Sequence, residues 1–285
     1  MTPAFLESEI GLLKPEQALF QVIPVPYEAT VSYGGGTAEG PAALLAASQQ
    51  LETWDGFSVP ADEGIYTWPF VNCKQGAEAV LAAIEQATAR ALDFGLPVLL
   101  GGEHSITTGA LRALKKKYGT FGVVQFDAHA DLRDTYEGSP YSHACVMHRA
   151  LDLGLPVFQL GVRALSLPEV HLQQEKNIGF LDAHTLHTTP LPEKILPPDF
   201  PGCIYITFDV DGLDPAVIPG TGTPEPGGLT WTQAMLLLQK VTTERTPIGF
   251  DVVELAPLAG QHVSEFAAAR LVYNIMGMIT RGIRA

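Results

Sequence analysis

The chain has 285 residues, of which 46% are hydrophobic and 17% are charged. This balance provides ample apolar surface for a folded core, and the length suits one α/β enzyme, so we predict a single domain over residues 1–285. Acidic residues outnumber basic ones by 31 to 17, which gives a net charge of −14. Such a charge disfavours nucleic acid and anionic membranes as partners and is compatible with a cationic ligand.

The chain contains three cysteines, Cys73, Cys145 and Cys203, and no Cys-x-x-Cys pair. An odd number without close pairs indicates neither a disulfide framework nor a thiolate zinc cage. The N-terminus lacks a basic region followed by an apolar run, and no stretch approaches the roughly 20 apolar residues of a membrane helix. We therefore expect a cytoplasmic protein without a membrane segment.

Apolar runs of strand length alternate with segments of helical period along the chain. The predicted strands are residues 19–23, 98–100, 122–126, 157–161, 204–208 and 248–252. Helical spacing is clearest for Val80, Leu81, Ile84, Ala87 and Ala91, and again for Ile106, Ala110, Leu111 and Leu114. This alternation predicts an α/β fold of three layers, with a mainly parallel central sheet covered by helices on both faces.

Two long segments fit neither pattern. Residues 27–40 contain three consecutive glycines, and residues 211–228 are dense in Gly and Pro. Long irregular loops within a compact domain are usually functional, and both segments follow a predicted strand, where open α/β sheets bind ligands. We expect both loops to border the functional site.

Metal-ligating side chains follow three of the predicted strands. The segments are Gly101-Gly102-Glu103-His104, Asp127-Ala128-His129-Ala130-Asp131 and Asp209-Val210-Asp211. In extended backbone, residues 127, 129 and 131 point to one side, so their side chains converge. Each segment alone also has a structural interpretation, because aspartates cap helices, Asp-x-Asp is common in turns, and a lone histidine is often a satisfied core residue.

Taken together, the three segments predict a metal site. The candidate ligands are His104, Asp127, His129, Asp131, Asp209 and Asp211. Six ligands are too many for one ordinary ion but suit two divalent ions that share bridging carboxylates. An oxygen-rich set favours Mn²⁺ over Zn²⁺, and a pair of such ions is typical of two-metal hydrolases.

With these motifs the sequence resembles the ureohydrolase family of arginases, agmatinases, formiminoglutamases and guanidino-acid hydrolases, and most of all its agmatinase branch. The matching motifs occupy residues 101–105, 127–131, 208–215 and 219–230, in the family's order. The resemblance implies an arginase-like fold, two Mn²⁺ ions per chain and hydrolysis of a guanidino group to urea and an amine. It further implies agmatine as substrate, putrescine as product, and a homotrimer or homohexamer.

The family pattern also assigns a role to each metal ligand. It makes Asp127 and Asp209 the bridging carboxylates. One manganese is then completed by His104 and Asp131, and the other by His129 and Asp211. By lowering the pKa of water, two such ions provide a hydroxide nucleophile at neutral pH.

The resemblance extends to residues that act on the substrate. His143 aligns with the family's proton-shuttling histidine and Glu254 with its guanidinium-binding carboxylate, and together with Asp131 they form the expected catalytic set. Many members have Gly-Thr-Pro after this histidine, whereas residues 144–147 here read Ala-Cys-Val-Met. The segment therefore departs from the family pattern after the histidine, while His143 itself is retained.

Two loops bear on the substrate's tail. Residues 132–138 and 161–166 lack the polar and acidic residues with which arginases hold an α-amino acid head. We therefore expect a guanidinoalkyl amine to be preferred over arginine, because a buried zwitterion without partners is costly. Tyr136 and Glu137, with Asp134, are candidates to bind an ammonium group at the end of the tail. Guanidinobutyrate and similar acids stay open as alternative substrates, because the charge of Arg133 could pair with their carboxylate.

Other functions remain open from sequence alone. The chain could be a guanidinobutyrase, a formiminoglutamase or an arginase, or a non-catalytic regulatory member of the same family. Retention of all the expected ligands argues against a non-catalytic role. An amide deacetylase on a related fold is a further alternative, which metal content distinguishes because such enzymes usually need a single zinc.

Overall fold

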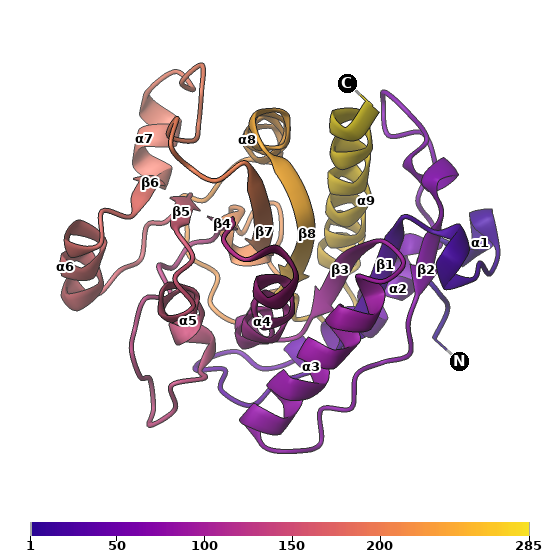
Figure 1. The fold of residues 1–285 in the computed structure, drawn as a ribbon, viewed down its shortest axis with the longest axis horizontal. Helices are drawn as coiled ribbons and strands as arrows, with labels where there is room; N and C mark the ends of the chain where they lie inside the picture. The colour runs from indigo at the N-terminus through magenta and orange to yellow at the C-terminus, as the bar shows by residue number, and fades with distance from the viewer. Residues whose placement is uncertain (1, 285) are drawn as a thin grey trace.

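The computed structural model describes residues 2–284, without the side chain of Arg284, and contains one eight-stranded, wholly parallel sheet (Figure 1). The strands are β1 (Phe20–Val25), β2 (Ile65–Thr67), β3 (Leu96–Gly101), β4 (Gly122–Phe126), β5 (Val157–Leu160), β6 (Gly179–Leu181), β7 (Cys203–Asp209) and β8 (Thr246–Val253). Their spatial order is β2-β1-β3-β8-β7-β4-β5-β6.

The six strands predicted from sequence correspond to β1, β3, β4, β5, β7 and β8, with ends that differ by two residues or fewer. The two edge strands β2 and β6 were not predicted. Each has three residues, and the side chains of β6 are partly exposed, so no apolar run marks them. Short edge strands of this kind take their pairing from a neighbour rather than from their own pattern.

Helices connect the strands. The α-helices are α1 (Glu7–Ile10), α2 (Gly40–Ser48), α3 (Ala77–Ala91), α4 (Thr107–Tyr118), α5 (Val146–Asp152), α6 (Leu167–Glu175), α7 (Ala183–Thr188), α8 (Trp231–Glu244) and α9 (Val263–Arg284). The 3₁₀ turns are η1 (Pro15–Gln17), η2 (Thr37–Glu39), η3 (Pro60–Glu63), η4 (His104–Ile106), η5 (His143–Cys145) and η6 (Val210–Gly212).

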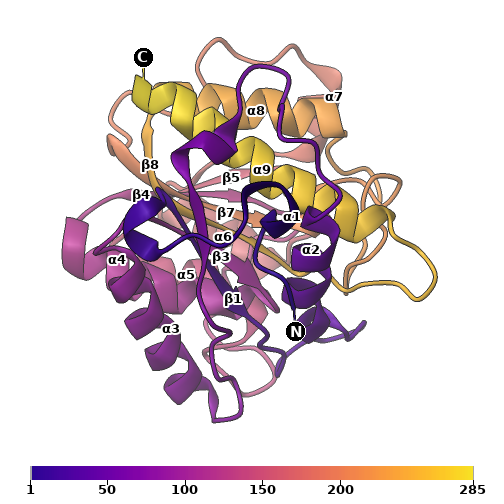
Figure 2. The ribbon, with the colours of Figure 1, turned by 90° about the vertical axis from the view of Figure 1, so that its right-hand side faces the viewer.

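The sheet is the middle of three layers, as Figures 1 and 2 show. One apolar cluster joins a face of the sheet to α2, α8 and α9, and a second joins the other face to α3, α4 and α5. Successive residues of β7 alternate between the clusters, with Ile204 and Ile206 in the first and Tyr205 in the second. The predicted three-layer α/β/α fold is confirmed, and burial on both faces explains why the strands read as continuous apolar runs.

Among residues 2–284, no helix is both long enough and apolar enough to cross a lipid bilayer.

The strand order places the functional motifs beside one another. The four central neighbours β3, β8, β7 and β4 run parallel, so the segments that follow them emerge at one edge of the sheet. After β3 the chain passes so close to Tyr27 that a Cβ on Gly102 would lie 2.0 Å from the Tyr27 carbonyl oxygen. Only glycine fits there, and this turn directs His104 over the sheet edge.

The two glycine-rich loops meet at the same edge. The backbone N–H of Gly34 donates to the carbonyl oxygen of Gly222 at 3.1 Å, which joins loop 27–40 to loop 211–228. The first loop ends in η2 and the start of α2, so it is shorter than the sequence predicted.

Candidate active site

Four neighbouring strands supply the candidate metal ligands and Glu254. His104 begins η4 after β3, Asp127 follows β4, Asp209 ends β7, and Glu254 follows β8. Their side chains are all buried at the carboxyl edge of the sheet. Parallel pairing brings together residues that lie up to 150 positions apart in the sequence.

One group of candidate ligands surrounds His104. Its Nδ1 atom lies 3.1 Å from Asp127 Oδ2, 3.1 Å from Asp131 Oδ2 and 3.3 Å from Asp209 Oδ2. Oxygen and nitrogen donors packed this closely form a candidate metal-binding group.

A second group adjoins the first and contains His129. Its Nδ1 atom lies 3.0 Å from Asp211 Oδ2 and 3.7 Å from Asp127 Oδ1. Asp127 therefore directs one oxygen to each histidine, which is the arrangement of a carboxylate shared by two metal ions. The structure brings the six candidate ligands to one place: His104, Asp127 and Asp209 form one group with Asp131 beside it, and Asp127, His129 and Asp211 form the other. Asp127 belongs to both groups, whereas Asp209 belongs only to the first.

The hydrogen bonds of His104 determine its tautomer, that is, which ring nitrogen carries the lone pair. Thr207 Oγ1 donates its proton to Asp251 Oδ1 at 2.6 Å, and Thr207 Oγ1 itself lies 2.8 Å from His104 Nε2. Thr207 can then only accept from Nε2–H, so Nδ1 of the neutral ring carries the lone pair. This buried Nδ1 has no hydrogen-bond partner among the described residues, as suits a metal ligand.

The electrostatics of the site also favour cations. In the metal-free site, burial disfavours a charge on His104, but the adjacent carboxylates of Asp127, Asp131 and Asp209 outweigh the effect of burial and hold the pKa of the imidazole well above its usual value. Burial raises the pKa of Asp209, and the charges of Asp211 and Asp127 raise it further. Without metal, protons would have to neutralise the crowded carboxylates, so the donor set fits divalent cations in their place.

Backbone strain is concentrated in the site. Asp131 and Glu254 have φ angles of 53° and 63°, in the left-handed region that few residues other than glycine adopt. Each such residue costs on the order of 1–3 kcal/mol unless its surroundings hold it. Here the Asp131 carbonyl accepts from the N–H of Met147 at 3.0 Å, and the Glu254 N–H donates to Gly102 at 2.8 Å.

Glu254 is anchored at the floor of the site. Its Oε1 accepts the backbone N–H of His104 at 2.6 Å, and burial raises the pKa of its carboxyl group well above the usual value. It lines a small hollow together with His143, Ser32 and Thr223. These three residues also line the main cavity, so Glu254 lies next to that cavity but not on its wall.

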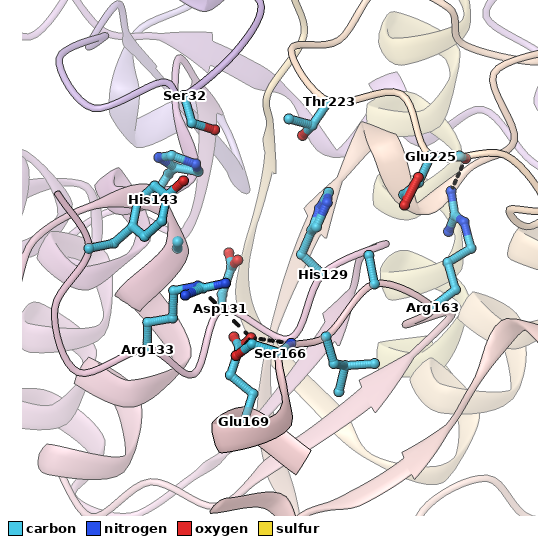
Figure 3. Close-up of a pocket in the computed structure, with 14 residues that line it drawn as sticks. Ser32, His129, Asp131, Arg133, His143, Arg163, Ser166, Glu169, Thr223 and Glu225 are labelled. Atoms are coloured by element: carbon cyan, nitrogen blue, oxygen red, sulfur yellow. Dashed lines mark hydrogen bonds and ion pairs between the residues drawn. The ribbon is translucent and has the colours of Figure 1, made fainter.

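The cavity lined by His129 and Asp131, called the main cavity here, has a volume of about 520 Å³ (Figure 3). His129 and Asp131 lie at its base, and His143 and Tyr136 line one side, where their rings meet edge to face with centroids 5.9 Å apart. His129 is the more exposed candidate ligand, with a side chain 31% accessible. A substrate in this cavity would therefore contact both metal groups and His143.

The residues expected at the substrate's tail lie in different places. Arg133 and Tyr136 line the cavity, and the guanidinium of Arg133 lies 5.0 Å from the centroid of the Tyr136 ring. Asp134 is exposed and pairs with Arg149 at 2.7 Å, and Glu137 lies in an exposed turn with φ 49°. Neither Asp134 nor Glu137 is among the described residues that line the cavity.

Other cavity residues were not identified from the sequence. Glu169 and Glu225 contribute carboxylates to the wall, and Thr223 donates to Asp211 Oδ2 at 3.3 Å. Arg163 ties loop 211–228 in place, because its guanidinium donates to the carbonyls of Asp211 at 2.7 Å and Glu225 at 2.6 Å. Glu225 and Thr223 lie within the motif 219–230, but nothing local indicates which of its side chains face the substrate.

Comparisons with known proteins match most of the chain. A model of the arginase family matches residues 18–277. An N(1)-aminopropylagmatine ureohydrolase of Synechocystis sp. is 42% identical, over 96% of this chain and 92% of that protein, and an agmatinase of Pyrococcus horikoshii is 30% identical, over 96% and 97%. The crystal structure of an agmatine ureohydrolase of Thermoplasma volcanium has a TM-score of 0.87 at 30% identity, covering 97% of this chain and 94% of that one.

Proposed function

This chain belongs to the arginase family, and from that membership we propose that it hydrolyses agmatine to urea and putrescine with two manganese ions. It is a ureohydrolase, a hydrolase of guanidino C–N bonds. The observation that carries the proposal is the placement of His143 on the wall of the cavity, and of Glu254 beside that cavity, next to two histidine–carboxylate groups that share Asp127.

Manganese is supported by the chemistry of the ligands. Four carboxylates and two imidazoles form an oxygen-rich set without a thiolate, which suits Mn²⁺ better than Zn²⁺. When bound, the two ions lower the pKa of water and so supply the nucleophile. Asp127 and Asp209 would hold both ions, with His104 and Asp131 on one and His129 and Asp211 on the other.

The protein's own groups orient the substrate and transfer the proton. Glu254 can accept hydrogen bonds from the guanidinium and fix its carbon above the metal groups. The carboxylate of Asp131 reaches the cavity from the metal side and completes the catalytic set. His143, on the cavity wall, would give a proton to the leaving nitrogen as the C–N bond to the tail breaks.

The charges in the cavity support a cationic tail. Glu169 is already occupied, because it accepts from the N–H of Leu132 at 3.1 Å and that of Ser166 at 2.8 Å, and it lies 3.9 Å from Arg133. Glu225, by contrast, makes no side-chain hydrogen bond or ion pair with the described residues. This leaves one carboxylate on the wall free to receive an ammonium group.

A second candidate substrate is N(1)-aminopropylagmatine, which carries a longer tail with an additional amine. It is favoured by the name of the 42% identical relative and by the position of Glu225 in the cavity wall. Urea release should be measured with agmatine, N(1)-aminopropylagmatine, arginine, guanidinobutyrate and formiminoglutamate. Arginine as the best substrate would refute both candidates, and bound metal without any urea would favour a regulatory protein.

Glu225 distinguishes the two candidates. If the longer amine is the substrate, Glu225→Gln should lower kcat/KM for it by up to about tenfold, because an ion pair is lost, and should affect agmatine less. Glu137→Gln is the matched control, since its carboxylate lies outside the cavity lining. Equal values for wild type and Glu225→Gln would rule out this role for Glu225.

We also propose that residues 1–285 form one domain and that the chain works in the cytoplasm as a homotrimer or homohexamer, on a small cationic guanidino compound rather than on nucleic acid or a membrane. A single sheet runs through the fold, and free Cys73, Cys145 and Cys203 suit a reducing compartment. Sedimentation of the purified protein tests the assembly, and a monomer would contradict it.

A further inference from the structure

We propose that Thr30 and Glu103 are positioning residues that hold His143 in the tautomer and orientation needed to protonate the leaving nitrogen. The inference rests on the proposed function, because it assumes that His143 is the proton donor. Neither residue touches the reacting atoms, and the two lie in different segments that only the fold brings to His143.

Glu103 is a fully buried carboxylate whose oxygens are saturated by donors. Oε2 accepts the backbone N–H groups of Ala29 at 2.6 Å and Thr30 at 2.7 Å. Oε1 accepts the hydroxyls of Thr30 at 2.7 Å and Ser105 at 2.6 Å. The carboxylate therefore fixes both the backbone and the side chain of Thr30 while it lies next to the candidate ligand His104.

Towards His143, the Thr30 hydroxyl can act only as a hydrogen-bond acceptor. Its single hydroxyl proton is donated to Glu103, so Oγ1 acts as an acceptor towards other groups. Oγ1 accepts the backbone N–H of His143 at 3.0 Å and lies 3.3 Å from its Nδ1. Because this oxygen cannot donate, the contact is attractive only when Nδ1 carries a proton.

A protonated Nδ1 leaves Nε2 as the nitrogen that exchanges a proton with the substrate. Ser142 Oγ, also 3.3 Å from Nδ1, can accept or donate and so does not oppose this tautomer. On the other side, Tyr136 meets the imidazole edge to face with an interplanar angle of 87°. The ring is thus fixed between Thr30 and Tyr136. In the reaction, the imidazolium, protonated on both ring nitrogens, gives its Nε2 proton to the leaving nitrogen, which also keeps the electron pair of the broken C–N bond. Nε2 then takes up a proton from solvent, while Nδ1 keeps its proton towards Thr30.

The test removes the Thr30 hydroxyl with little change in shape. For Thr30→Val we expect kcat on agmatine to fall by about 10- to 100-fold, a part of what general acid catalysis contributes, with KM changed by less than about threefold. Thr30→Ser retains the hydroxyl and should restore most of kcat. Thr37→Val is the matched control, because Thr37 is buried in the same loop and its hydroxyl donates to Glu28 at 3.3 Å.

A second substrate separates positioning from a general structural role. In 3-aminopropoxyguanidine an oxygen replaces the methylene next to the guanidino nitrogen, so the leaving alkoxyamine is a much weaker base and needs less protonation. The kcat defect of Thr30→Val should then shrink to about threefold or less. An equal loss on both substrates, or a change in KM alone, would overturn the inference.

Two controls complete the experiment. If Thr30→Val does not fold, as judged by thermal unfolding, Thr30→Ala is measured instead and interpreted in the same way. If wild type releases urea from agmatine and Thr30→Val retains full kcat, the inference is wrong while the proposed function stands. If wild type releases no urea from either compound, the proposed function fails, and the inference fails with it.

Discussion

A threonine hydroxyl links a buried carboxylate to the candidate metal ligand His104, and another links a buried carboxylate to the proposed proton donor His143. Thr207 donates to Asp251 and faces His104, and Thr30 donates to Glu103 and faces His143. In each case the threonine donates its hydroxyl proton to the carboxylate, so its oxygen can only accept a hydrogen bond from the histidine. A neutral hydroxyl fixes a tautomer without adding a further charge to a site already crowded with carboxylates.

Asp127→Ala should abolish urea release and lower the bound metal, because among the described residues only Asp127 directs oxygens to both His104 and His129. The loss of metal affinity should exceed the 10- to 100-fold that is typical of residues outside the ligand set. Metal analysis and a urea assay check this, with exposed Asp93→Ala as control. An active variant with unchanged metal content would contradict the ligand assignment.

At the scale of elements, the long helix α9 is joined to the loop before η3 by a partly buried ion pair between Arg281 and Asp55. Arg281 Nη1 donates to the carboxylate of Asp55, which also accepts the N–H groups of Phe57 at 2.9 Å and Ser58 at 2.7 Å. Burial opposes the charge on Asp55, yet these hydrogen bonds outweigh it and lower the pKa of the carboxyl group. The ion pair therefore contributes to the stability of the layer formed by α2, α8 and α9.

Asp55→Asn should lower the free energy of unfolding at pH 7 by about 1–2 kcal/mol, the low end of the cost of removing a hydrogen bond to a charged group, because solvent screens the partly exposed Arg281. Because folding lowers the pKa of Asp55, its contribution is present above the unfolded value of about 3.9 and is lost as pH falls through the folded value. Denaturant unfolding at neutral and acidic pH measures the difference between wild type and variant.

Glu78→Gln provides the control for this measurement. Glu78 pairs with Arg112 at 2.8 Å but its side chain is 61% exposed, so we expect a change of no more than about 1 kcal/mol. A difference between wild type and Asp55→Asn that persists unchanged at low pH would show that the ionised carboxylate is not the source of the effect.

At the scale of the whole molecule, five carboxyl groups gather where a cationic substrate and divalent ions would bind. The net charge is −14, and the central strand ends bring four ligand carboxylates and Glu254 to one edge of the sheet. Metal binding and the stability of this edge are therefore coupled, because cations relieve the repulsion that otherwise favours protonation.

A chelator should abolish activity, and Mn²⁺ should restore it better than Mg²⁺. Activity should also rise from acidic to mildly alkaline pH. Burial, and then the charge of Asp127, raises the pKa of Asp131 to about 6, so protons compete with metal as pH falls through this range. Urea release across pH in metal-depleted and reloaded protein tests this, and a chelator-resistant enzyme with an acidic optimum would contradict it.

The sequence alone determined the fold class, six of the eight strands and the ligand motifs, because strand period and strand-end chemistry are local. Residues 127–131 follow β4, so the sequence placed their side chains at one strand end, but Asp131 reaches the site with a φ of 53° rather than in the extended backbone that was predicted. Only the tertiary structure placed β3, β8, β7 and β4 side by side. Likewise Thr30 reaches His143 across 113 positions, and Glu225 takes its place in the cavity through a loop held by Arg163. Such contacts depend on strand order and loop packing, which are long-range interactions without a local signal.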